Sequence, residues 1–344
     1  MADEIATLLL KRFHSLETQR QTWESHWQEV ADYVVPRKAD VTKNRSPGDK
    51  RSELVFDGTA ILAAELLSAS LHGMLTNSST SWFSLRYTDA DLNGDDEAME
   101  WLQGVEDVMY QAFNRSNFQE QISELYHDLV TFGTAVMFID EDEEQQIRFS
   151  TRHIKECYVS EDDKGRVDTV YRKFKMPGGA ALKRFGDASF NSKILKKAEN
   201  NPYDQVTLIH AVFPRSDRDV TKITAENKPF ASVYIEPDEK VVISESGFDE
   251  FPYCCPRFSK SSFEIGYGRS PSMTALADIK MLNRMSEVTI RAAQKQVDPP
   301  LLVPDDGFML PVRTVPGGFL AQDRDQKRIN PKEFEVVTER QPTE

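Results

Sequence analysis

The chain has 344 residues, of which 39% are hydrophobic and 28% are charged, and its formal net charge is −14 with a pI near 5.0. This length and apolar content suffice for more than one compact unit. The acidic balance excludes a protein that grips nucleic acid over its whole surface, because phosphate affinity needs clustered lysine and arginine, but it allows a local basic strip.

The cysteines and the apolar stretches indicate the compartment. Cys157, Cys254 and Cys255 give an odd count with no CxxC or Cys/His ligand spacing, which fits the cytosol or a particle assembled there. The N-terminus is acidic, unlike the start of a secretory signal. The most apolar stretch, 61–75, is shorter than the roughly 20 residues that a membrane helix needs. We therefore expect a soluble protein with no membrane partner.

The first predicted helix covers residues 3–34 and ends before Pro36. Its stripe positions alternate spacings of four and three and so share one face: Leu9, Phe13, Leu16, Arg20, Trp23, Trp27, Val30 and Val34. We favour an amphipathic helix that lies on its own domain. The alternative is a seam against a neighbouring subunit, which Arg20 within the stripe disfavours.

More helices follow a polar loop. Residues 43–52 have the composition of a mobile surface segment. Residues 60–75, capped by Asp57 or Thr59, are apolar on nearly every side and predict a central, buried helix. Residues 81–85 predict a short strand or an anchor, and two further helices cover 95–113 and 118–132, the second ending at Gly133.

From residue 135 the periodicity becomes that of strands. Residues 135–139 and 146–149 predict a hairpin around the acidic turn 140–144. Further strands are predicted over 157–159, 167–174, 206–213 and 231–244, with short helices over 180–185 and 192–200. The sequence therefore predicts an α+β fold in which a small mixed β unit is inserted between helical layers.

The last predicted helix covers residues 272–297, about 39 Å at about 1.5 Å per residue. Ser270 is its expected N-cap, Pro271 its first residue and Asp298-Pro299-Pro300 its end. At about 100° per residue, one narrow face carries a strip of Lys280, Arg284, Glu287, Arg291 and Lys295. Met281, Met285 and Val288 flank this charged strip on one side, and Leu282 and Ile290 lie on the other. This pattern suits a helix wedged between neighbours; the alternative is a core helix with a solvated outer face.

No catalytic constellation is recognisable. The sequence has no GxxxxGK[ST], HExxH or GxSxG motif, so we predict no enzyme, no catalytic residue and no cofactor. The carboxylates from Asp140 to Glu144 could hold a metal ion for a nuclease, but consecutive side chains diverge, and a solvated hairpin tip is the preferred interpretation. We therefore predict no metal site.

Several segments together resemble the head-to-tail connector (portal) family of short-tailed bacteriophages. They are residues 55–60 with the apolar helix up to 82–85, then 131–135, 168–174, 268–273, 275–283 and 298–304. Among them Gly268-Arg269-Ser270-Pro271-Ser272-Met273 and the segment from Asp298 to Pro304 are the most specific. The segments follow one another in the family's order over most of residues 50–305.

The resemblance implies a ring, usually of twelve subunits, at one capsid vertex of the virion, assembled in the host cytoplasm. Double-stranded DNA would pass through it non-specifically, and terminase, tail adaptors, the major capsid protein and scaffolding protein would be partners. Residues 1–134 would be the helical part of a wing, 135–269 its mixed β part, 270–297 a stem helix and 298–344 part of a clip. Family members continue with a second stem helix, so the resemblance implies a C-terminally shortened chain. The remaining alternative is another virion protein, such as a tail adaptor or internal head protein.

Overall fold

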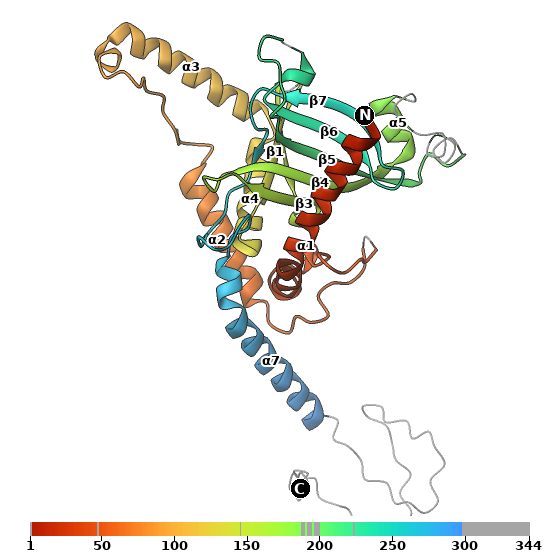
Figure 1. Cartoon of the computed structure of the whole chain (residues 1–344). Coiled ribbons are helices and arrows are strands. Elements are labelled where there is room, and N and C mark those ends of the chain that lie inside the picture. The colour runs from red at the N-terminus through yellow and green to blue at the C-terminus, as the bar shows by residue number, and fades with distance from the viewer. Residues whose placement is uncertain are drawn as a thin grey trace, which may run out of the picture. The chain divides into compact units, whose positions relative to one another are not determined.

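The computed structural model describes residues 2–297, apart from residues 47, 145, 187–189, 191–194, 196–199 and 223. The chain divides into two units, residues 1–287 and 288–344. In the described part of the first unit, helices α1 to α4 precede strands β1 to β8, which only the short helix α5 and 3-10 turns interrupt. This α+β arrangement confirms the predicted class (Figure 1). The predicted end of the last helix at 298–300 and the predicted clip, 298–344, lie outside the described residues.

Helix α1 (Ala2–Val34) lies on the sheet of its own chain, as the favoured interpretation predicted. Leu9, Phe13 and Leu16 are buried against Tyr158 and Tyr171 of that sheet. Farther along, Trp27 is fully buried and its Nε1 donates to the Phe132 carbonyl at 3.0 Å. The stripe is therefore the inner face of an amphipathic helix rather than a coiled-coil seam.

The strands form two antiparallel sheets. The smaller has the order β2-β1-β8 and the larger the order β3-β4-β5-β6-β7, in which every pair of neighbours in sequence is also a pair in space. The bounds are β1 Val136–Asp142, β2 Gln146–Arg152, β3 Cys157–Glu161, β4 Val167–Pro177, β5 Gln205–Pro214, β6 Phe230–Glu236, β7 Val241–Phe248 and β8 Tyr253–Cys254.

The structure corrects one predicted strand and bears on the two short helices predicted among the strands. The single strand predicted over 231–244 is wrong, because the chain turns back after Glu236 and β6 pairs with β7. Lys240 has a φ of 57°, a conformation that ends an extended strand. The short helix α5 (Gly178–Phe185) is present as predicted, whereas most of the helix predicted over 192–200 lies outside the described residues.

Helices α3 (Asp96–Arg115) and α4 (Phe118–Phe132) enclose an aromatic cluster. Trp82 stacks on Phe118 with ring centroids 5.8 Å apart and also meets Phe113. Residues 81–85 are therefore an anchor and not a strand. Gly133 ends α4 with a φ of 76°, which confirms the predicted helix stop.

Helix α2 (Thr59–Leu75) is not the buried central helix that its composition predicts. Only Ala64 and Ser68 are buried, whereas Leu62 and Leu66 are 66% and 67% exposed. An apolar sequence on all sides predicts that the helix is covered, but in the part of the chain that the structure describes, Leu62 and Leu66 are left exposed. The exposed leucines therefore indicate a surface that another chain can cover.

Candidate functional site

The candidate site is helix α7 (Pro271–Val297) with the elements that hold its first four turns. The Ser270 Oγ accepts from the Met273 N–H at 2.9 Å and donates to the Thr131 carbonyl at 2.8 Å. The Ser272 hydroxyl donates to the Val130 carbonyl at 2.9 Å. Ser270 is thus the predicted N-cap, and the two hydroxyls also fasten the start of α7 to the end of α4.

Asn283 is the polar anchor of α7 that sequence reasoning missed. Its side chain is buried; it donates to the Leu54 carbonyl at 2.8 Å and accepts from the N–H groups of Phe56 and Asp57 at 2.7 and 3.1 Å. One amide group therefore satisfies three backbone groups of the segment that leads into α2. An asparagine in mid-helix beside apolar residues was the available signal, because such a residue is unfavourable in a helix unless its side chain has partners.

We expect Asn283→Ala to lower the free energy of unfolding by about 1–3 kcal/mol, because buried backbone groups lose their partners. Urea denaturation followed by circular dichroism measures this change. Gln294→Ala, an exposed position of the same helix, is the matched control and should leave the midpoint within error. Equal midpoints for the two variants would show that the Asn283 contacts contribute nothing.

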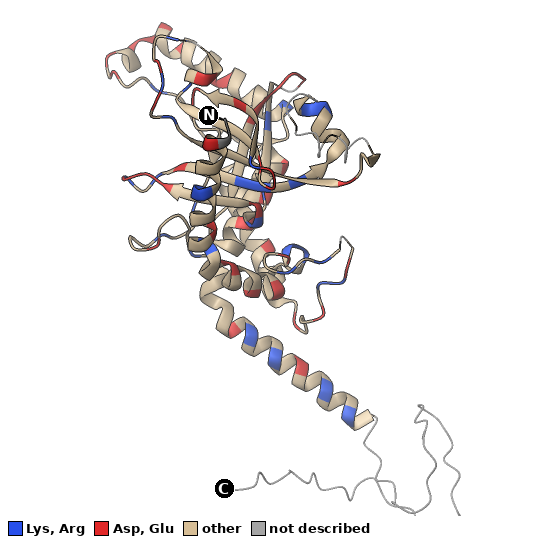
Figure 2. Cartoon of the chain, turned by 45° about the vertical axis from the view of Figure 1, so that its right-hand side comes forward, with Lys and Arg blue, Asp and Glu red and all other residues tan. Residues whose placement is uncertain are grey.

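Blue and red positions recur along α7 (Figure 2). The first residues of the charged strip form ion pairs within the chain. The Lys280 ammonium forms an ion pair with Glu29 of α1, and this hydrogen bond raises the pKa of Lys280. The Arg284 guanidinium meets the Glu287 carboxylate at 2.6 Å; the Arg284 side chain is 67% exposed, whereas the Glu287 side chain is 11% exposed. Arg291 and Lys295 are exposed. Lys280 and Glu287 therefore mark the side of α7 that borders its own domain.

Both apolar flanks of α7 are open to solvent in the single chain. Met281 and Met285 are each 60% exposed and Val288 is 51% exposed, while on the other flank Leu282 and Ile290 are 40% and 43% exposed. Burial of such side chains stabilises by roughly 25 cal/mol per Å² of apolar surface. Within the described part of the chain, both apolar flanks of α7 are therefore largely exposed, on two sides of the charged strip.

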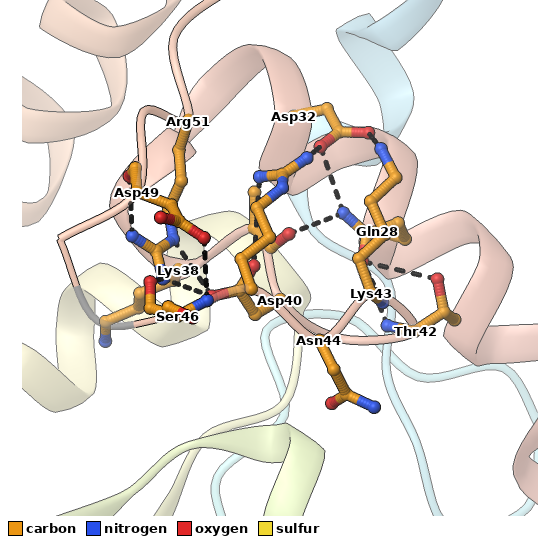
Figure 3. A network of polar contacts seen from close by, with 12 residues as sticks. Gln28, Asp32, Lys38, Asp40, Thr42, Lys43, Asn44, Ser46, Asp49 and Arg51 are labelled. Atoms are coloured by element: carbon orange, nitrogen blue, oxygen red, sulfur yellow. Dashed lines mark hydrogen bonds and ion pairs between the residues drawn. The ribbon is translucent and has the colours of Figure 1, made fainter.

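The loop between α1 and α2, predicted to be a mobile segment, is tied to α1 by polar contacts (Figure 3). The Lys43 ammonium lies 2.7 Å from Asp32, and the Arg51 guanidinium lies 2.6 Å from Asp40. The Gln28 amide donates to the Ala39 carbonyl at 2.7 Å and accepts from the Thr42 N–H at 2.9 Å. Ion pairs and amide hydrogen bonds between residues 11 to 14 positions apart hold this loop, and local composition does not report such pairings.

The acidic run does not assemble a metal site among the described residues. Asp140 and Asp142 lie on β1, opposite Arg148 and Gln146 of β2, and Asp142 accepts from the Glu144 N–H at 2.9 Å. Within the described ranges no group of three or more histidine, cysteine, aspartate or glutamate side chains could hold a metal ion. In the same part of the chain, no helix has the length and apolar character needed to cross a membrane.

Two relatives and one family match the chain. It is 32% identical over 316 residues to a "Probable portal protein" of Bordetella phage BPP-1, which covers 91% of this chain and 57% of the relative. It is 30% identical over 321 residues to a "Portal protein" of Salmonella phage epsilon15, covering 92% of this chain and 58% of that relative. The chain thus spans somewhat over half the length of these relatives. The family described as bacteriophage head to tail connecting protein matches residues 6–341. Because this match extends over nearly the whole sequence, the chain belongs to the bacteriophage head to tail connecting protein family.

Proposed function

We propose that the protein is a subunit of a portal ring, a closed assembly of identical chains at one vertex of a phage capsid. The observation that carries the proposal is α7, whose two apolar flanks are both exposed in one chain. A ring built from one kind of contact requires two different, complementary interaction surfaces on each subunit. The two apolar flanks of α7 can provide both. Membership of the connector family and the names of the relatives support the same assignment.

The ring would be a conduit for double-stranded DNA during packaging and ejection and a docking platform for terminase and tail proteins. Capsid and scaffolding proteins would surround it in the virion. We propose that residues 1–269 form the wing, 270–297 the stem and 298–344 part of the clip, and that twelve copies close the ring. The net charge of −14 fits a conduit, because DNA must slide and many tight phosphate contacts would hold it.

The charged strip of Lys280, Arg284, Glu287, Arg291 and Lys295 would act inside this ring, on the DNA path or on acidic groups of the neighbouring subunit. We expect the variant with glutamine at all four cationic positions to fold normally and to package or retain less DNA. Thermal melting of the purified variant and the DNA content of purified phage heads measure the two effects. A DNA content equal to that of the wild type in the quadruple variant would show that the charged strip has no role in DNA packaging or retention. Gln294→Ala, beside the strip, is the control for the helix surface.

Genetic removal tests the function itself. A phage that lacks this protein should yield heads without packaged DNA, and supply of the protein in trans should restore full heads. DNA-filled heads in its absence would contradict the proposal. A tail adaptor is the alternative, for which the expected phenotype is filled heads that lose DNA or lack tails. A metal-dependent nuclease at Asp140–Glu144 has less support, because these carboxylates do not converge among the described residues.

A further inference from the structure

A pocket of about 310 Å³ lies between α2 and α7. Its apolar walls come from Ala60, Ala63 and Leu67 of α2 and from Ala275, Ile279 and Leu282 of α7. Three of these six residues are alanines, whose short side chains leave the hollow, and Asp57 stands at its edge. An apolar hollow of this kind contributes to stability only when an apolar side chain fills it.

We propose that this pocket receives Met281 of a second copy of the chain, and that this is the contact that closes the ring. The inference rests on the proposed function and identifies the residues that the ring contact uses. Met281 is 60% exposed, is not among the residues that line the pocket, and lies on the other apolar flank of α7 from Leu282. An unbranched thioether side chain is suited to fill an irregular gap between two helices.

The positions of Met281 and of the pocket around the axis of α7 suit a ring. Counting about 100° per residue from Lys280, Met281 lies at about 100°, and Leu282, Ala275 and Ile279, the apolar α7 residues of the pocket wall, lie at about 200°, 220° and 260°. Faces 180° apart would give a straight row of copies, and a ring of twelve needs about 150°, which lies within the roughly 100–160° between Met281 and these three pocket residues. Met281 and the pocket lie at a similar height along the axis of α7, so each copy needs little translation along that axis relative to the one before. A contact without such translation can close into a ring, whereas a contact with translation gives an open helical filament.

The direction of the curve agrees with how α7 is packed. The side that packs on its own domain carries Leu276 and Asn283, at about 320° and 300° on the same count. This side lies about 120–140° round the helix from the inner side of the curve, which is at about 180°. The domain of each chain therefore lies away from the inner side of the curve. The charged strip, at about 340–60°, also lies away from it, so this contact favours acidic groups of the neighbouring subunit, and not the DNA path, as the partners of the strip.

Charge complementarity supports the same occupant. Arg284, next to Met281 on the exposed side, has a side chain that is 67% exposed. At the pocket edge, hydrogen bonds from the side chain and backbone of Thr59 lower the pKa of Asp57, so this carboxylate is ionised at neutral pH. The Asp57 N–H donates to the Asn283 side chain, which places Asp57 at the level of Arg284. When Met281 enters the pocket of the next copy, Arg284 approaches that copy's Asp57 from the same, outer side.

Disulfide trapping between two populations of the full-length protein tests the contact. One population carries Met281→Cys, the other Ala63→Cys at the pocket wall, both in a Cys254→Ser background because Cys254 is exposed. After co-assembly and mild oxidation, we expect a mixed disulfide dimer on non-reducing gels, and neither population alone should give it. The matched control replaces Ala63→Cys by Ala69→Cys, also exposed on α2 but about 120° round the helix, and its yield should be at least about tenfold lower. Arg284→Glu in the Met281→Cys population should reduce the yield.

Electron microscopy of the same samples distinguishes failure of the proposed contact from failure of the proposed portal function. Rings without the Met281–Ala63 cross-link, or with a cross-link to Ala69 of equal yield, would overturn this contact and leave the portal function standing. Absence of both rings and cross-link would overturn the proposed function and the contact together. Rings with the Ala63-specific cross-link support both.

Discussion

Arg20→Ala should lower the free energy of unfolding by about 3–5 kcal/mol, because it removes one member of a buried, fully paired charge cluster. Arg20 is 2% exposed. Its guanidinium donates to the carbonyls of Ile154, Lys155 and Cys157 at 2.9, 3.0 and 2.7 Å, and it meets Glu24 at 2.6 Å. These contacts join α1 to the turn before β3, so the change should be visible in the urea midpoint of the whole domain.

Two further variants sharpen this prediction. Arg20→Lys should recover little of the loss, since an ammonium group cannot reproduce the fork of donors that reaches three carbonyls and a carboxylate. Arg12→Ala, eight residues earlier on the same helix, removes an exposed side chain with one hydrogen bond of 3.2 Å to Thr169 and should have a much smaller effect. An Arg20→Ala midpoint equal to that of Arg12→Ala would contradict an anchoring role for Arg20.

Gly133→Ala should be about as damaging, with an expected loss of about 3 kcal/mol. Gly133 has a φ of 76°, which disfavours a side chain. A Cβ at this position would lie 2.4 Å from the Gly268 carbonyl oxygen and 2.6 Å from the Ser270 nitrogen. To avoid this clash, the backbone of residues 268–270, which leads into α7, would have to move. The substitution should therefore also disturb ring assembly.

Gly104→Ala is the matched control for the glycine substitution. Gly104 lies within α3, and a Cβ there would meet no atom within 4 Å. Alanine is the better helix former by about 0.5–1 kcal/mol, so this variant should be slightly more stable than the wild type. Thermal melting followed by circular dichroism compares the two variants. A melting temperature for Gly133→Ala at or above the wild-type value would refute the close approach of Gly133 and Gly268.

The local signals in the sequence predicted most elements well. The stripe of α1, the stop of α4 at Gly133 and the cap of α7 at Ser270 each depend on residues within a turn or two of one another. Local chemistry decides such features, and the structure confirms all three. The acidic hairpin of β1 and β2 was equally accessible from its alternation.

The features that depend on distant partners were not predictable. Arg20 counted only as an irregularity in an apolar stripe, because its carbonyl acceptors lie over 130 residues away. Asn283 was not predicted as an anchor for the same reason, because its acceptor, the Leu54 carbonyl, lies 229 residues away in the sequence. The apolar composition of α2 predicted a buried helix, which the structure contradicts, because composition does not report which sides of a helix the rest of the chain covers.

Electron microscopy of the purified full-length protein tests the central claim most directly. We expect closed rings with rotational symmetry and a central opening. Met281→Asp puts a carboxylate into the proposed pocket contact and should lower the fraction of protein in rings while the circular dichroism spectrum stays unchanged. Gln294→Asp, on the same helix, should form rings like the wild type. Monomers or open chains of the wild-type protein under all assembly conditions would contradict the account.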